Sequence, residues 1–271
     1  MKGAARVHWW IEEVSPGARL LGDAARAAGA RVSAWDDAWW SSRRFPAEAE
    51  EAVVFHGSLG NADRIRRELP WRPGAFCDAA AFEYGRWAPA VRRWLVNEAW
   101  VATTAAALAA DPWGVAAQAG AGAAIFVRPS SALKPFAGRV LAVSAVSLAA
   151  LDHGFYYEDA QTGVIVAPVR RIGQEWRLVI AGGEVVCASG YVAEGRRALE
   201  VAAPEAVVRF AAAVVGSLPP LDLIFVMDVA EVEGALGLME VNPFSGADLY
   251  GCDRRAVVAA VHALIEGGEG P

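Results

Sequence analysis

The sequence predicts an α/β fold whose later part is of the α+β type, and two observations support this prediction. Through residues 1–95, short apolar runs alternate with helical patterns, which is the rhythm of parallel strands joined by helices. From Glu175 onward, apolar runs come in neighbouring pairs joined by glycine-bearing turns, which is typical of antiparallel hairpins. We therefore expect a small parallel sheet first and antiparallel pairing later.

The first elements follow this rhythm. Helices are expected at Ala18–Ala28, where Gly29 can end the helix, and at Ala62–Glu68. The expected strands are Arg6–Ile11, Arg31–Trp35, Ala52–His56 and Gly74–Cys77. The order strand, helix, strand favours a parallel sheet, because a crossover helix returns the chain to the same end of the sheet.

Residues 98–120 are alanine-rich and predicted to be helical, with a break at Asp111-Pro112 because helical backbone is disfavoured before proline. A strand from Ile125, a polar loop, strands around Val140 and a helix from about Ser147 should follow. The last elements are expected to be two hairpins and two helices: strands within 175–181, 184–191, 221–228 and 236–241, and helices at 204–215 and 254–265.

Composition excludes several classes of protein. The chain carries 31 acids and 25 bases, so no general basicity is available to hold a nucleic acid. Its longest uncharged run, Pro112–Val127, is shorter than the roughly 20 residues of a membrane-spanning helix. The three cysteines, Cys77, Cys187 and Cys252, form no CxxC pair and are expected to be reduced thiols. We expect a cytoplasmic protein with no nucleic-acid and no membrane partner.

The last predicted hairpin carries the strongest chemical signal. Glu240 and Asn242 lie two residues apart in a strand, so their side chains share one face. If the turn is the three residues 233–235, Asp228 falls directly opposite Glu240. Two carboxylates so close repel each other, and a hard divalent cation such as Mg²⁺ would relieve the repulsion. The alternative is that all three are solvated residues on the polar face of a hairpin.

Two further segments carry cations. In the stretch 125–138, Arg128 follows an apolar strand, and Lys134 lies six residues later in a loop with Ser130 and Ser131. Such a loop can present an ammonium, a guanidinium, hydroxyls and backbone N–H groups to phosphates, although a basic surface turn is an equally simple interpretation.

The other cationic segment is a predicted strand on which Glu175 and Arg177 share a face. Its plain interpretation is a surface ion pair. Its functional interpretation places Arg177 over a transferring phosphoryl group or a substrate carboxylate.

Read in order from Val96 to Ala260, these segments resemble the ATP-grasp superfamily. Phe126-Val127-Arg128-Pro129 stands where that family has a strand that supplies a cation to the α- and β-phosphates, and Ser130–Gly138 stands where it has a phosphate loop. An arginine in place of the usual lysine is similar to the branch named for two arginines and one lysine, which here are Arg128, Arg177 and Lys134.

The resemblance implies a site that holds ATP and Mg²⁺. The metal ligands would be Asp228, Glu240 and Asn242, with Arg177 and Lys134 in catalytic roles. The residues implied in ATP binding are Arg128, Ser130, Ser131, Lys134, Ala167, Pro168, Val169 and Glu175.

The same resemblance implies the domain organisation and the activity. Residues 1–95 would form a pre-ATP-grasp α/β domain, followed by an ATP-grasp domain with a small lobe (96–167) and a large lobe (168–271). The implied activity is ATP-dependent joining of a small-molecule or peptide carboxylate to an amine through an acyl phosphate. A regulator that only binds ATP, a small-molecule kinase on the same fold and a homodimeric state all stay open.

Two other features are open at this stage. His56 ends a predicted strand before Gly57-Ser58, and in an α/β sheet such a strand end can face a ligand. The tryptophans of the first 40 residues either pack within the N-terminal domain or form an aromatic face for a partner: Trp9, Trp10, Trp35, Trp39 and Trp40.

Overall fold

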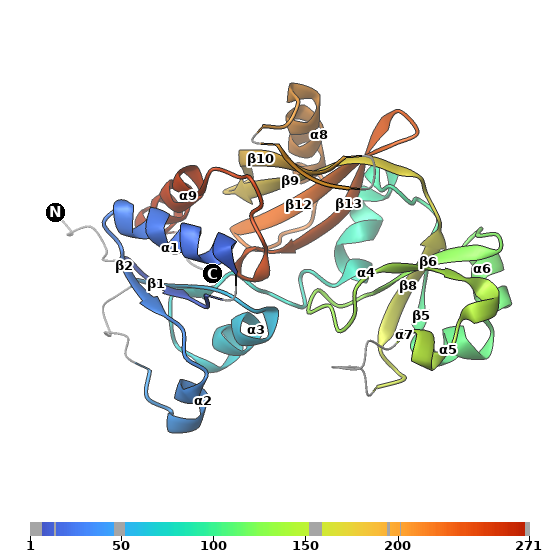
Figure 1. Cartoon of the computed structure of the whole chain (residues 1–271), viewed down its shortest axis with the longest axis horizontal. Coiled ribbons are helices and arrows are strands. Elements are labelled where there is room, and N and C mark those ends of the chain that lie inside the picture. Colours follow the sequence, from blue (N-terminus) through green and yellow to red (C-terminus); the bar gives the residue numbers. More distant parts are fainter. Residues whose placement is uncertain are drawn as a thin grey trace.

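The computed structural model has three sheets, which confirms the predicted α/β fold with later antiparallel sheets. Figure 1 shows the N-terminal unit at one end of the molecule, a small lobe at the other end and a five-stranded sheet between them. The structure describes residues 7–13, 15–45, 52–151, 159–193, 196–200 and 202–268. Within these ranges no helix is both long and apolar enough to cross a membrane.

The N-terminal unit is a four-stranded parallel sheet in the order β2-β1-β3-β4. The strand order reverses between β1 and β3, since β2 lies on one side of β1 and both later strands lie on the other. The strands are β1 (Val7–Ile11), β2 (Arg31–Ala34), β3 (Ala52–His56) and β4 (Pro73–Ala75), and the helices are α1 (Pro16–Ala27), α2 (Ala38–Ser42) and α3 (Leu59–Glu68).

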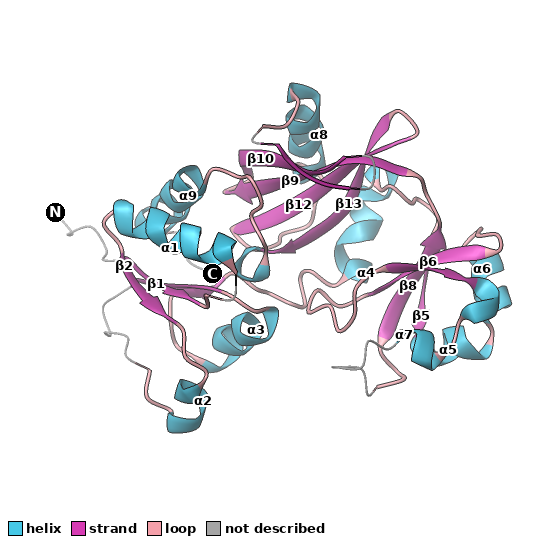
Figure 2. Cartoon of the chain, viewed as in Figure 1, coloured by secondary structure: helices cyan, strands magenta, loops and turns pink. Residues whose placement is uncertain are grey.

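The small lobe is an antiparallel sheet in the order β5-β8-β6-β7, with short helices packed beside it in Figure 2. Its elements are β5 (Val101–Thr104), α5 (Ala105–Ala110), α6 (Pro112–Gln118), β6 (Ala124–Pro129), β7 (Arg139–Ala142), η2 (Val143–Ala145), α7 (Leu148–Leu151) and β8 (Gly163–Pro168).

The prediction of helix through residues 98–120 is wrong at its start. Residues 101–104 form strand β5, which pairs with β8. Two β-branched threonines favour extended backbone here, and pairing with a buried strand overrides the alanine-rich surroundings. Thr104 then caps α5 through its hydroxyl, and Asp111 caps α6, so the predicted break before Pro112 is confirmed.

The large lobe is an antiparallel sheet in the order β11-β10-β9-β12-β13. One face packs against α8, α4 and η1 in an apolar cluster that includes Trp176, Met227 and Val241. Its elements are β9 (Ile172–Ala181), β10 (Glu184–Ala193), β11 (Arg196–Glu200), α8 (Glu205–Val215), β12 (Ile224–Val232), β13 (Ala235–Pro243), η3 (Phe244–Gly246) and α9 (Arg254–Glu266), joined by α4 (Tyr84–Trp87) and η1 (Ala88–Trp94) from the preceding segment.

The turn of the β12–β13 hairpin differs from the prediction, but the predicted pair survives. The turn has two central residues, Glu233 and Gly234, both with positive φ, which matches the strand twist better than a three-residue loop. A β-bulge between Leu238 and Glu240 then shifts the register by one residue. Asp228 therefore lies opposite Glu240 as predicted, although for a different reason.

The N-terminal unit and the large lobe share one apolar core. Side chains of β1 and α1 pack with Val179 and Val226 on the second face of the large sheet, and α9 completes this cluster. Residues 82–95, by contrast, pack against the first face of the large sheet rather than into the parallel sheet. The domain boundary at residues 95 and 96 remains a prediction.

The tryptophans of the first 40 residues are mostly buried, which supports their packing interpretation. Trp10, Trp35 and Trp40 lie in one cluster on the parallel sheet, with Trp39 partly buried beside them. Trp9 faces the other core, where its indole N–H donates to His262 Nε2.

Candidate active site

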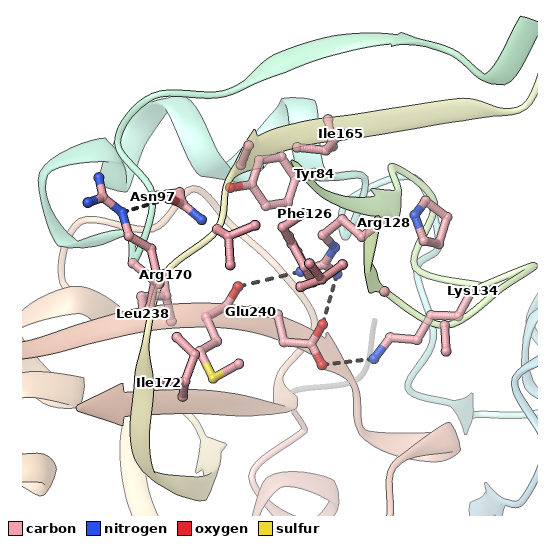
Figure 3. A pocket seen from close by; sticks show the side chains of 18 of the residues that line it. Tyr84, Asn97, Phe126, Arg128, Lys134, Ile165, Arg170, Ile172, Leu238 and Glu240 are labelled. Atoms are coloured by element: carbon pink, nitrogen blue, oxygen red, sulfur yellow. Dashed lines mark hydrogen bonds and ion pairs between the residues drawn. The ribbon is translucent and has the colours of Figure 1, made fainter. Parts of the chain in front are cut away.

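A cavity of about 410 Å³ lies between the small-lobe sheet and strand β13. Its walls are mostly apolar, which suits the flat ring of a nucleotide base. Its polar end is formed by Arg128, Lys134 and Glu240 (Figure 3). The lining residues are Tyr84, Val96, Asn97, Phe126, Arg128, Pro129, Lys134, Phe136, Ala137, Gly138, Val140, Ile165, Ala167, Val169, Arg170, Ile172, Leu238, Met239 and Glu240.

Two cations of the small lobe meet one acid of the large lobe at this polar end. Arg128 Nη2 lies 2.8 Å from Glu240 Oε2, and Lys134 Nζ lies 2.8 Å from Glu240 Oε1. Arg128 also donates to the Met239 carbonyl at 3.4 Å, with its guanidinium 5.3 Å from the Tyr84 ring. The structure therefore brings the two predicted cations and one of the predicted acids into direct contact. Their roles toward ATP and a metal stay predictions.

The electrostatics of Glu240 follow from these contacts. Burial alone would raise the pKa of its carboxyl, but the nearby Arg128 and Lys134 outweigh burial and hold this pKa well below its usual value. Glu240 is therefore ionised at neutral pH. A polyphosphate that entered the cavity would compete with this carboxylate for the same two cations.

A second ion pair occupies the same row of the sheet. The register places Arg177, Asp228 and Glu240 side by side on β9, β12 and β13. Arg177 binds both oxygens of Asp228, with Nε–Oδ1 at 2.8 Å and Nη2–Oδ2 at 2.6 Å. Its remaining nitrogen, Nη1, donates to the Asp248 carbonyl at 2.8 Å.

This second pair is sealed. The side chains of Arg177 and Asp228 are only 8% and 2% exposed, and neither residue lines the cavity. Burial alone would lower the pKa of Arg177, but the Asp228 carboxylate outweighs it and raises that pKa. The structure thus brings Arg177 next to the polar end of the cavity without placing it in the wall.

The residues fit a magnesium ion in part. The Asn242 side-chain N–H donates to Glu240 Oε1 at 2.8 Å, while its Oδ1 is buried and has no hydrogen-bond partner among the residues that the structure describes. An amide oxygen and a carboxylate are suitable ligands for a hard cation, and rotation of the Asn242 amide would turn its oxygen toward Glu240. Asp228 is less available because Arg177 occupies both of its oxygens.

A metal here would also need ligands from elsewhere. Among the residues that the structure describes, no cluster of three His, Cys, Asp or Glu side chains fits around one ion. The two protein oxygens of Glu240 and Asn242 would therefore leave the remaining positions to phosphates and water, which is how proteins commonly hold Mg²⁺.

The other predicted site residues divide into two groups. Ala167 and Val169 line the cavity, whereas Pro168 between them does not. The two serines support the loop: Ser130 Oγ donates to Glu83 Oε1 at 2.5 Å, and Ser131 Oγ accepts from the Leu133 amide.

Glu175 belongs to the second group, which lies off the cavity. It accepts a hydrogen bond from the Tyr191 hydroxyl at 2.7 Å, and burial raises the pKa of its carboxyl. Its predicted part in ATP binding stays a prediction.

Several cavity residues were not anticipated from the sequence. Tyr84, Asn97 and Arg170 come from loops and a short helix with no recognisable pattern, and Arg170 Nε donates to Asn97 Oδ1 at 3.0 Å beside the cavity (Figure 3). One usable signal in the sequence was overlooked. The chain has 25 bases, and its only lysines are Lys2 and Lys134. A lysine in such an arginine-rich chain indicates a role for which arginine is not suited.

Comparisons with known proteins identify the fold and the family of the chain. Solved structures share the fold at low sequence identity. D-cycloserine synthetase DcsG has a TM-score of 0.59 and 17% identity, with 96% of this chain and 99% of that one covered. D-alanine–D-alanine ligase from Bacillus anthracis has a TM-score of 0.58 and 11% identity, with 98% and 100% covered.

A third similar structure is the ATP-grasp ligase PsnB, described as complexed with minimal precursor, Mg and ADP. It has a TM-score of 0.55 and 15% identity, with 95% of this chain and 96% of that one covered. No curated protein sequence matches this chain significantly. The family model for the ATP-grasp domain, R2K clade family 2, matches residues 98–260, more than half of the chain and all of the polar row described above. The chain therefore belongs to R2K clade family 2 of the ATP-grasp domains, and its fold is that of the ATP-grasp ligases.

Proposed function

We propose that this protein is an ATP-dependent carboxylate–amine ligase that forms an amide bond, with ADP and orthophosphate as the other products. One observation carries the proposal. Arg128 and Lys134, from the small lobe, converge on Glu240 of the large lobe at the polar end of an apolar cavity. At that end, an ATP site needs cations that can exchange a carboxylate partner for the phosphates of the nucleotide.

In this proposal the adenine lies among the apolar walls and the phosphates lie against the two cations. Arg128 presents a planar fork, and Lys134 presents a compact charge at a backbone position with positive φ in the loop after β6. Glu240 and Asn242 would hold Mg²⁺, which neutralises phosphate charge when it is bound. Arg177 keeps Asp228 in place beside them.

The proposed reaction has two steps. A substrate carboxylate oxygen bonds to the γ-phosphorus as the bond to ADP breaks, which leaves an acyl phosphate. The amine nitrogen then bonds to the acyl carbon, orthophosphate leaves, and the nitrogen loses a proton. The protein's part is to position these groups, to neutralise charge and to exclude water from the acyl phosphate.

Two alternatives would use the same cavity. A regulator would bind ATP without turnover, but the ion pair of Glu240 with two cations is more than a bare nucleotide-binding site requires. A small-molecule kinase would release ADP and a stable phosphorylated product, with no orthophosphate. Measuring ADP and orthophosphate together separates all three functions.

The test is an assay of ADP and orthophosphate release over pools of carboxylic acids and amines. We expect both products to appear in equal amounts with at least one pair of pools. The variant Lys134→Ala should stay folded and lose about a hundredfold in turnover, because the loss of one preorganised charge contact costs about 3 kcal/mol of barrier. Wild-type turnover in this variant would remove the phosphate role of Lys134.

The remaining assignments accompany this proposal. We place the division of the chain at residues 1–95, 96–167 and 168–271, and the protein in the cytoplasm. The three thiols are free. A homodimer stays a prediction that the mass of the protein in solution would decide.

A further inference from the structure

Two of the three cysteine thiols contact each other on one face of the large sheet, outside the cavity. Cys187 belongs to strand β10, and Cys252 lies just before helix α9. Their side chains are hydrogen-bonded to each other, although the two residues are far apart in the sequence. The third thiol, Cys77, lies in the aromatic cluster of the N-terminal unit. The fold therefore creates one pair of neighbouring thiols and one separate thiol.

The strand register places this pair close to the polar row of the candidate site. One row of residues crosses four strands on this face of the sheet: Cys187, Val179, Val226 and Asn242. The neighbouring row on the same face is the one that holds Arg177, because residues two apart on a strand share a face. The thiols thus lie at one end of a sheet face whose other end carries a candidate metal ligand.

The segment that carries Cys252 is bonded to this face at two points. The Cys252 thiol donates to the Arg177 carbonyl, with 3.7 Å between Sγ and the oxygen. The Gly251 N–H donates to Ser189 Oγ at 3.1 Å. Cys252 is only 2% exposed, whereas Cys187 is partly exposed. A small reagent in the solvent therefore reaches the pair from the side of Cys187.

Cys187 is the more reactive member of the pair. The Cys252 S–H and the backbone N–H groups of Asp253 and Val179 can donate to a thiolate at Cys187, and together they outweigh burial and lower the pKa of Cys187. Asp253 is the N-cap of the 13-residue helix α9, and a helix N-terminus favours a thiolate, although the Asp253 charge opposes it. The hydrogen bond with Cys187 raises the pKa of Cys252, and so does burial. The thiolate is the nucleophile in thiol chemistry, so Cys187 reacts first.

Cys77 has none of these features and serves as a reference within the same chain. Its side chain is 1% exposed and packs among apolar residues on the parallel sheet. Burial raises the pKa of Cys77 to about 12, so this residue stays a protonated thiol at neutral pH. A buried, protonated thiol is inert toward oxidants. Any oxidation that is specific to the pair should therefore leave Cys77 unchanged.

We propose that Cys187 and Cys252 are a redox pair that hydrogen peroxide converts into a disulfide between β10 and the segment before α9. The Cys187 thiolate attacks one oxygen of the peroxide, the O–O bond breaks, hydroxide leaves, and Cys187 becomes a sulfenic acid. The Cys252 sulfur then bonds to the Cys187 sulfur, and the sulfenic oxygen leaves as water with the Cys252 proton. The thiol pair loses two electrons and the peroxide gains them. The inference does not depend on the proposed ATP chemistry.

The disulfide fastens the start of α9 to the large sheet. Helix α9 packs against α1 and against β9 and β10, and its apolar side chains complete the core that the N-terminal unit and the large lobe share (Figure 1). A crosslink restricts the unfolded chain more than the folded one. The oxidised protein should therefore unfold at a temperature roughly 5–10 °C above that of the reduced protein.

The test follows the thiols of the full chain after exposure to hydrogen peroxide. Free thiols are alkylated in denaturant, and mass spectrometry of tryptic peptides separates the pair, since Cys187 falls in residues 178–196 and Cys252 in residues 210–254. We expect these two peptides to become linked in the wild type and Cys77 to remain open to alkylation. A dithiol reductant should reverse the link and return the unfolding temperature to its starting value.

Two serine variants separate the roles of the two thiols. Cys187→Ser should slow the loss of thiols at least tenfold, because Cys252 is buried. Cys252→Ser keeps a hydroxyl that can donate to the Arg177 carbonyl, and its reaction should stop at a Cys187 sulfenic acid, which a 1,3-diketone reagent traps.

Three outcomes overturn the proposal. The first is that all three thiols survive peroxide that fully oxidises free cysteine in a parallel sample. The second is that Cys187→Ser loses its thiols at the wild-type rate. The third is that oxidised Cys187 is linked to a second chain, or ends as a sulfinic acid, instead of being linked to Cys252.

Discussion

Two acids on one row of the large sheet, Asp228 and Glu240, form ion pairs that differ in how far water reaches them. Arg177 and Asp228 bind each other through two hydrogen bonds in the interior. Glu240, on the adjacent strand, is 18% exposed and shares its carboxylate between Arg128 and Lys134 at the cavity wall. The Lys134 side chain, at 34% exposed, is the most accessible of the five.

This difference in solvent access separates a structural role from a ligand-binding role, which the sequence pattern alone does not distinguish. A sealed pair holds the geometry of the row, because opening it would leave a charge buried without a partner. A pair at the wall can exchange, because water and phosphate can replace either member. We therefore expect substitutions in the first pair to affect stability first, and substitutions in the second to affect ATP first.

The largest expected effect is on folding. Asp228→Ala should lower the free energy of unfolding by about 3–5 kcal/mol, because it leaves the Arg177 guanidinium buried and unpaired. Glu240→Ala should lower it less than Asp228→Ala does, since water reaches the Lys134 partner of this carboxylate. Urea denaturation at pH 7 measures both.

A double variant sharpens this contrast. Asp228→Leu combined with Arg177→Met removes both charges at once and should cost less than Asp228→Ala alone. If Glu240→Ala proves as destabilising as Asp228→Ala, the distinction between a sealed and an exchangeable pair has no basis.

Acid titration extends the comparison to a third buried acid. Asp222 is bound by Arg66 at 3.2 Å and by the Asp78 amide, yet burial raises the pKa of Asp222 to about 6. Since the folded state then holds a proton that the unfolded state has lost, stability should fall by at most about 3 kcal/mol as the pH rises from about 4 to 6. Asp222→Asn should remove this slope in unfolding experiments across that window.

The lowered pKa of Glu240 predicts the opposite dependence of folding stability on pH. Its pKa is lowered in the folded state by Arg128 and Lys134, so its contribution is complete above the usual glutamate pKa and is lost as the pH falls below that value. Glu240→Gln should flatten the acid end of the stability profile and leave the Asp222 window unchanged. A Glu240→Gln profile that matches the wild type below pH 4 would contradict the assigned direction.

A smaller effect is expected in the chemical labelling of lysine. Because the Lys134 side chain is about one-third exposed and the chain has only one other lysine, an amine-reactive ester followed by mass spectrometry reports on it directly, with Lys2 as internal reference. Mg-ATP at ten times its Kd should slow labelling of Lys134 about tenfold, since about one site in eleven stays free. Equal labelling with and without ATP would mean that the nucleotide does not displace the Glu240 contact.

The contacts of the candidate site that could be predicted from the sequence are those between residues that lie close together along the chain. The Asp228–Glu240 pair is local to one hairpin, so counting residues across the turn found it, even though the turn and the bulge were both missed. The cationic loop followed a strand and was found for the same reason. Both are patterns within a few residues of one another.

Contacts between distant segments were not predictable in this way. Nothing in the sequence near Arg177 indicates that a strand 51 residues later supplies its carboxylate partner. Strand β5 was hidden for a similar reason, because its pairing with β8 lies outside the alanine-rich window. His56 likewise lies where three separate segments meet, near residues 15–18 and 246–249, and the sequence indicated only that a strand end was there.

The smallest effect tests whether the guanidinium shape of Arg128 matters beyond its charge. Arg128 reaches Glu240 and the Met239 carbonyl together, with the Tyr84 ring nearby, and a lysine cannot make both contacts. Arg128→Lys should raise KM for ATP about fivefold, in line with about 1 kcal/mol for one hydrogen bond, and change kcat less. The matched change in the sealed pair, Arg177→Lys, should instead lower the free energy of unfolding by roughly 1.5–3 kcal/mol and leave this KM nearly unchanged. Should Arg177→Lys raise KM more than Arg128→Lys does, the arginine that contacts ATP is the buried one, and closure of the lobes must open the Asp228 pair.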